Sequence, residues 1–148
     1  MAKDENSKSR KINTLQFGEI SVDPEHIFVF PGGMLGFENL REFVLISEEE
    51  TVPFKWLISL EEPEIGFPLL SPWHIDISYD PGKGFDYDKQ VIFVVVTLED
   101  DEGLMTSNMK APLVLDVEKQ VGQQVILPTD KYSPNYVIRR REEEKQEK

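Results

Sequence analysis

The segment VIFVVVTL, at residues 91–98, decides the fold more than any other part of this sequence. Nearly every position in it is apolar, and most of its residues are β-branched. β-Branched and aromatic side chains favour strands over helices. A run that is apolar on both of its faces therefore predicts a central β-strand that is buried on both sides.

Shorter apolar runs on either side of this segment also predict strands. Every second residue of the segment FKWLISL, residues 54–60, is a large apolar one, which is the period of a half-buried strand. Phe28 and Phe30 alternate in the same way. Further strands are expected at residues 42–46, 113–117 and 124–127, with a turn at 121–123. Residues 35–41 are expected to form one helical turn.

Ten prolines and nine glycines interrupt these runs, at a spacing of roughly 8–12 residues that is typical of sandwiches and barrels. The prediction is an all-β protein, a small single-domain β-barrel or sandwich-like fold of short antiparallel strands with at most short helical turns. Residues 12–138 are expected to form this domain. The polar residues 1–11 and the charged residues 139–148 are expected to be flexible tails.

Composition narrows the possible classes of protein. The chain of 148 residues has no cysteine, which excludes disulfides, thiolate metal sites and cysteine nucleophiles. Its longest apolar run is far shorter than the ~20 residues that span a bilayer. The first residues also lack the apolar core of a secretion signal. We therefore expect a cytoplasmic protein without a membrane anchor.

The charge of the chain is negative and uneven. The net charge is −12, and residues 12–138 alone hold 7 positive and 22 negative charges, a net of −15. An acidic body repels phosphate backbones, so we expect no direct nucleic-acid binding. A basic protein would be the complementary partner, and the alternative, which the charge alone favours, is that the acidic surface serves solubility.

No group of residues predicts catalysis. His26 and His74 have no second histidine at the spacing of a metal site. The acidic loop at 80–88 lacks the ligand spacing of a calcium loop. No phosphate-binding loop or nucleophile elbow is present. We expect no metal, no cofactor and no enzyme activity. Two alternatives stay open: a small-ligand-binding β-barrel, and a hydrolase that uses two carboxylates.

Three motifs carry a specific resemblance. They are PGGMLGFE at 31–38, LISLEEPEIGF at 57–67, and TSNMKAPLV at 106–114 with GQQVIL at 122–127. Together, and in this order, they resemble the motifs of the flagellar assembly factor FliW family over about residues 13–138. Met34 and Leu35 depart from the first motif, because the family often has a small residue or proline there.

The resemblance implies an all-β, monomeric protein that binds other proteins in the cytoplasm. FliW-like proteins bind flagellin. They also bind the translational repressor CsrA and stop it from silencing flagellin messenger RNA, and free flagellin competes for them. The motifs and one acidic run supply the candidate protein-binding residues: Gly36, Phe37, Glu38, Pro63, Glu64, Phe67, Glu99, Asp100, Asp101, Glu102, Asn108 and Lys110.

Overall fold

The apolar run at 91–98 forms the strand from which the rest of the sheet is built. In the computed structural model, which describes residues 10–140, this strand is β7 (Gln90–Thr97). Its first half pairs with β9, its middle with β6 and its end with β8, all antiparallel. Phe93 packs in the central cluster and Val94 in a cluster on the opposite face, so the middle of β7 is buried on both sides as predicted, whereas Val91 at its start remains exposed.

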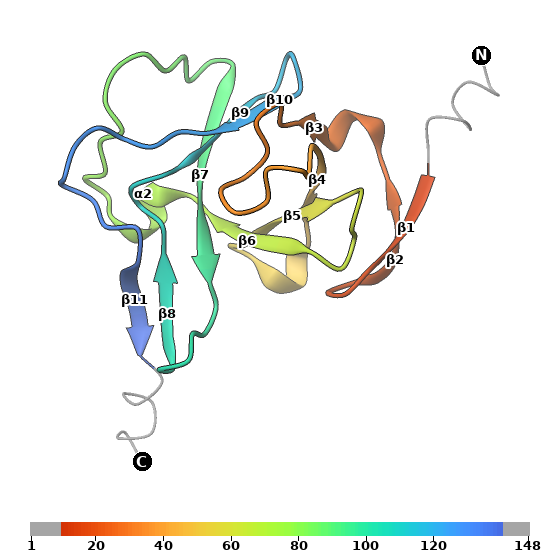
Figure 1. Ribbon diagram of the computed structural model, residues 1–148, viewed down its shortest axis with the longest axis horizontal. Coiled ribbons are helices and arrows are strands. Elements are labelled where there is room, and N and C mark those ends of the chain that lie inside the picture. Colours follow the sequence, from red (N-terminus) through yellow and green to blue (C-terminus); the bar gives the residue numbers. More distant parts are fainter. Residues whose placement is uncertain (1–9, 141–148) are drawn as a thin grey trace.

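Seven strands close into a barrel, in the order β7–β6–β5–β4–β3–β10–β9 and back to β7 (Figure 1). The all-β prediction is confirmed, although β10 and β3 pair in parallel. The other elements, in chain order, are β1 (Arg10–Thr14), β2 (Gly18–Val22), η1 (Pro24–His26), β3 (Ile27–Val29), β4 (Glu42–Ser47), η2 (Glu49–Thr51), β5 (Lys55–Ser59), β6 (Gly66–Leu70), α2 (Pro72–Ile75), β8 (Leu104–Ser107), β9 (Leu113–Asp116), β10 (Val121–Gln124) and β11 (Tyr136–Arg140).

Two strand pairs extend beyond the barrel. The β1–β2 hairpin forms a sheet of its own and packs on the outside of β4 and β5. At the other side, β8 and β11 continue the main sheet (Figure 1). Residues 10, 11, 139 and 140 therefore lie in strands, although the sequence placed them in the tails. The rest of the predicted tails, residues 1–9 and 141–148, falls outside the described residues.

Side chains fill the barrel. Phe30, Phe43, Leu57, Leu69 and Leu113 are fully buried and belong to one central cluster. A second cluster lies beneath the β1–β2 hairpin, around Trp56, and a third lies outside β7, around Tyr79. The side chains of the central cluster fill the middle of the barrel, where a ligand-binding barrel would need an open lumen.

Three local predictions were wrong, and the first is the strand at 124–127, because β10 ends at Gln124. Residues 121–123 are not a turn but lie in β10, and the turn occupies residues 117–120. Asp116 starts this turn by accepting the amides of residues 118 and 119. Gln120 ends the turn at a φ of 56° and donates from Nε2 to the carbonyls of Pro24 and Ile27, at 2.8 and 2.7 Å. These bonds tie the β9–β10 hairpin to β3.

Residues 35–41 also form no helix. Met34 and Phe37 bridge across a tight turn, with the amide of Phe37 donating to the carbonyl of Met34 at 2.7 Å. Gly36 lies at the tip of this turn with a φ of 85°, outside the helical region. The positive φ breaks the helical geometry that the apolar spacing suggested.

Candidate protein-binding face

The segment between β3 and β4 crosses one end of the barrel, in front of it in Figure 1. Gly33 allows this path, because it has a φ of 69° and a Cβ there would lie 2.6 Å from the Cα of Glu38. Met34 and Leu40 are buried and pack with half-buried Phe37 against the central cluster. We call the loop at residues 34–41 the plug, and the end of the barrel that these three side chains close the plugged mouth.

Two phenylalanines from different motifs meet at the plugged mouth. The rings of Phe37 and Phe67 are 5.2 Å apart in an edge-to-face arrangement, and Phe67 in turn lies 6.2 Å from Phe43. Edge-to-face pairs contribute about 0.5–1.5 kcal/mol beyond the burial of their area. Both rings therefore hold the plug in place and expose only part of their surface.

Hydrogen bonds fix both ends of the plug. The amide of Leu35 donates to Oε1 of Gln124 in β10, at 2.9 Å. At the other end, the carboxylate of Glu61 accepts the amides of Arg41 and Glu42, at 3.1 and 3.3 Å. Glu38 accepts the amide of Gly36 at 3.2 Å. The surface of the plug is thus held rigidly by the barrel.

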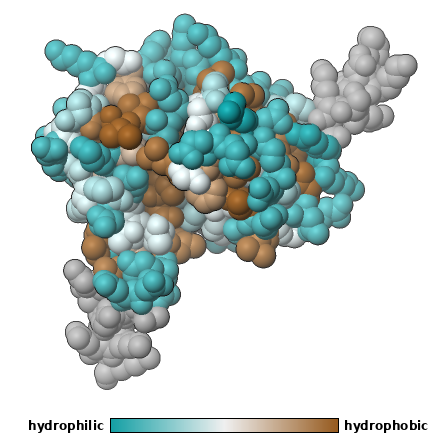
Figure 2. Space-filling model, in the orientation of Figure 1, coloured by the Kyte–Doolittle hydropathy of each residue, from teal (hydrophilic) through white to brown (hydrophobic). Residues whose placement is uncertain are grey.

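Leu35 projects from this rigid surface and is 50% exposed. A hollow of about 330 Å³ on one side of it is lined by Pro31, Glu38 and β10. A second hollow, of about 190 Å³, is lined by Leu35 itself, Met34, Phe67, Val95, Thr97, Thr106, Asn108, Gln124 and Pro134. We call Leu35 and these two hollows the Leu35 groove. Figure 2 shows apolar atoms gathered near the middle of this face, with hydrophilic residues around them.

Three of the predicted site residues line the Leu35 groove, one from each motif: Glu38, Phe67 and Asn108. The side-chain oxygen of Asn108 also accepts the amides of residues 110 and 111. Gly36 and Phe37 lie in the turn that carries Leu35 but line neither hollow, and the Phe37 ring packs on Phe67. Pro63 and Glu64 lie in the turn before β6 and line neither hollow.

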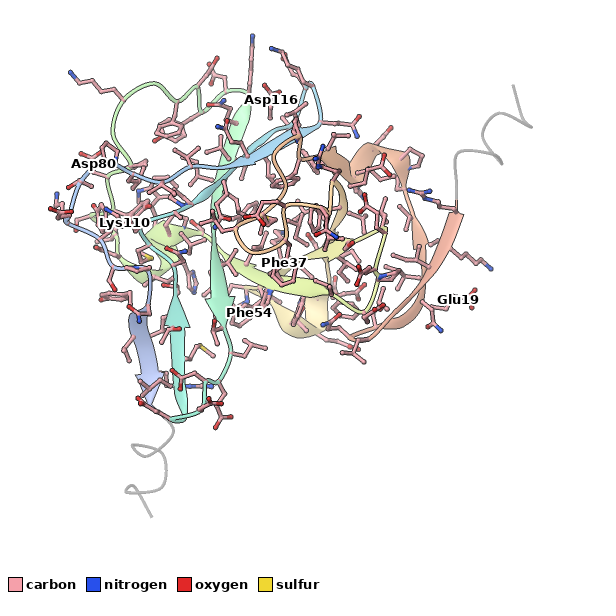
Figure 3. The ribbon with its side chains drawn as sticks, viewed as in Figure 1. Glu19, Phe37, Phe54, Asp80, Lys110 and Asp116 are labelled. Atoms are coloured by element: carbon pink, nitrogen blue, oxygen red, sulfur yellow. The ribbon has the colours of Figure 1, made fainter. Side chains whose placement is uncertain are left out.

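The remaining predicted residues lie elsewhere. Lys110 donates to the carbonyl of Thr129 at 2.6 Å and lies 3.9 Å from the carboxylate of Asp130, so it fastens a loop. Figure 3 shows it away from Phe37, on the side of Asp80. The acidic run at 99–102 forms the tip of the β7–β8 hairpin. Within it Asp100 accepts the amides of Glu102 and Leu104 and shapes the turn.

Two residues of this face, Leu35 and Gln124, were not predicted. Leu35 had a signal: it is an aliphatic residue in a glycine-rich turn, between side chains that fill the plug. Gln124 had none, because its role depends on a hydrogen bond to a residue 89 positions earlier in the chain. Only the folded barrel brings these two residues together.

No group of three or more potential metal ligands occurs within residues 10–140. Burial raises the pKa of Tyr79 well above its ordinary value, and its hydroxyl donates to the carbonyl of Met109 at 2.7 Å. Tyr79 therefore acts as a buried donor that joins two loops. Over the same residues, no helix has the length and apolar character to cross a membrane.

Comparison with known proteins gives a consistent result. The family model described as FliW protein matches residues 11–138. A flagellar assembly factor FliW of Thermosipho africanus is 35% identical over 132 residues, covering 82% of this chain and 90% of the relative. That of Caldanaerobacter subterraneus is 37% identical, covering 82% and 88%. A crystal structure of the flagellar assembly factor FliW superposes with a TM-score of 0.76 at 29% identity, covering 88% of this chain and 97% of that one.

Proposed function

The chain belongs to the FliW family of flagellar assembly factors, and from this premise we propose that it acts without catalysis, by binding flagellin and the repressor CsrA in the cytoplasm. One monomer binds one flagellin. The same protein binds CsrA and keeps it from silencing flagellin messenger RNA. Flagellin synthesis is thereby coupled to flagellum assembly.

The Leu35 groove is the observation that supports flagellin binding. Flagellin hides an apolar helical surface in the filament, and that surface needs a cover before assembly, because exposed apolar patches associate. An apolar helix face fits a groove with an aliphatic projection between hollows. The second hollow of the groove is lined by neutral polar side chains, among them Thr97, Asn108 and Gln124, which can form hydrogen bonds with a helix that carries no charge there.

The rigidity of the plug favours tight binding as well. Association costs free energy whenever side chains or loops become ordered on contact. Here the loop that carries Leu35 is already fixed, because its backbone amides donate hydrogen bonds to the side chains of Gln124 and Glu61. The groove is therefore formed before the partner arrives.

Leu35→Glu tests this assignment. We expect at least a tenfold loss of flagellin affinity, because a carboxylate would replace the aliphatic contact at the centre of the groove. Stability should change by less than about 0.5 kcal/mol, since the side chain is half exposed. Affinity is measured by calorimetry and stability by thermal melting.

Ile77→Glu is the matched control, because Ile77 is 90% exposed and lies outside the groove. It should bind flagellin like the parent protein. Equal binding by a folded Leu35→Glu protein would show that flagellin docks elsewhere.

Antagonism of CsrA draws on the acidic surface. The exposed carboxylates occur in dense groups, such as residues 48–50 and 99–102, rather than along a regular track. Such groups do not imitate the even charge spacing of an RNA strand. We therefore favour docking beside the RNA site, where repulsion acts within the ~8 Å over which salt screens charges.

Adjacent docking predicts a ternary complex at high RNA concentration and a shallow dependence of CsrA affinity on salt. Titrating RNA should raise the apparent dissociation constant for CsrA to a plateau, as measured by fluorescence anisotropy. A rise without limit, together with a steep salt dependence, would indicate direct mimicry of RNA instead.

A further inference from the structure

The end of the barrel opposite the plug is open. A cavity of about 550 Å³ lies there, and its lining includes the barrel residues Phe28, Leu45, Phe93 and Leu115. Val91 and Val117 also line it and remain 41% and 49% exposed. We call this cavity the open mouth.

The open mouth and the Leu35 groove are separate surfaces. Val91 lines the first and Thr97 the second, and both side chains lie on the same face of β7. Six residues of strand span about 20 Å. A partner at one end of the barrel therefore leaves the other end accessible.

Acidic residues surround the open mouth. Four chain segments each contribute at least one residue to its lining, and we call them the rim: residues 19–26, 47–55, 86–91 and 116–120. Together they hold ten acidic residues and three lysines, seven more negative charges than positive. Lys89 and Glu118 lie 3.9 Å apart, whereas the lining carboxylates of Asp23 and Glu48 form no ion pair within residues 10–140.

We infer that the open mouth docks a basic protein segment, one that inserts a large apolar side chain into the cavity and carries lysine or arginine residues on either side. The cavity supplies apolar burial, because Val91 and Val117 in its lining are incompletely covered. The rim supplies charge complementarity. Lys55 is the one lysine that lines the cavity, so the cations of the partner are expected over the surrounding carboxylates.

This inference does not depend on flagellin or CsrA, and synthetic peptides test it. The probe is a short peptide with a central phenylalanine flanked by lysines, and the matched peptide has glutamates in place of the lysines. Binding to the full-length protein is followed by methyl resonances in NMR. The lysine peptide should shift the methyl signals of Val91, Leu115 and Val117 and leave Leu35 unchanged. Its affinity should fall about tenfold between about 0.05 and 0.5 M salt, and the glutamate peptide should not bind.

Val91→Arg should weaken the lysine peptide at least tenfold, because it fills the cavity and repels the peptide's cations. Ile77→Arg adds the same charge at an exposed site outside the cavity and should bind like the parent. Equal binding of both peptides, or shifts confined to other residues, would overturn the inference. Shifts of Val91 and Val117 that follow protein concentration without peptide would also overturn it, since a second copy would then occupy the open mouth.

Discussion

Replacing Gly122 with alanine should lower the free energy of unfolding by about 3 kcal/mol, the upper end of the usual cost of overpacking a core. A Cβ at this position in β10 would lie 2.3 Å from two ring carbons of Phe30. Phe30 is fully buried and packs edge-to-face on Phe43 at 5.1 Å, so its ring has no free space to enter. The barrel would have to widen at its one parallel strand pair.

Urea denaturation measures this effect, and Gly32→Ala provides the control. Gly32 has no atom within 4 Å of an added Cβ and no positive φ. Its replacement should leave stability unchanged or raise it by a few tenths of a kcal/mol through the unfolded state. Equal stability of the two variants would mean that Phe30 and β10 can separate without cost.

The same glycine shows why part of the fold escaped the sequence. Strands with a strong apolar pattern, such as β7 and β5, were predicted because their signal is local. Gly122 favoured a turn by the same local logic. Its actual requirement is the close approach of Phe30, a residue that lies far from it in the chain. A long-range contact of this kind leaves no trace in nearby residue types.

The structural roles of two charged motif residues escaped prediction for a similar reason. Lys110 was expected to contact a partner, and Glu61 lies in the second motif. In the structure, Lys110 fastens the loop at Thr129, and Glu61 caps two amides at the start of β4. The motif residues thus include supports of the binding face as well as members of it.

Phe37 belongs to the supports, and its replacement by alanine should cost about 3 kcal/mol of stability, the lower end for losing a packed aromatic ring. The ring is half-buried, closes the barrel with Met34 and Leu40, and pairs with Phe67. Alanine would leave a cavity that the loop cannot fill, because Gln124 and Glu61 hold its ends. Urea denaturation of the full chain measures the loss.

A double-mutant cycle separates the ring pair from simple burial. Phe37→Ala and Phe67→Ala together should cost about 1 kcal/mol less than the sum of the single changes, because each single variant already loses the edge-to-face contact. Leu35→Ala, in the same loop but exposed, should change stability by less than about 0.5 kcal/mol. Additive losses from the two phenylalanines would mean that each ring stabilises the barrel through its own burial, without coupling between the two rings. A cost for Leu35→Ala as large as that for Phe37→Ala would mean that Leu35 also packs into the plug. Loss of flagellin binding by Phe37→Ala would therefore not by itself locate the binding site, because this change also loosens the barrel. Leu35→Glu removes a contact surface and leaves the barrel intact, so its binding loss is the one that locates the site.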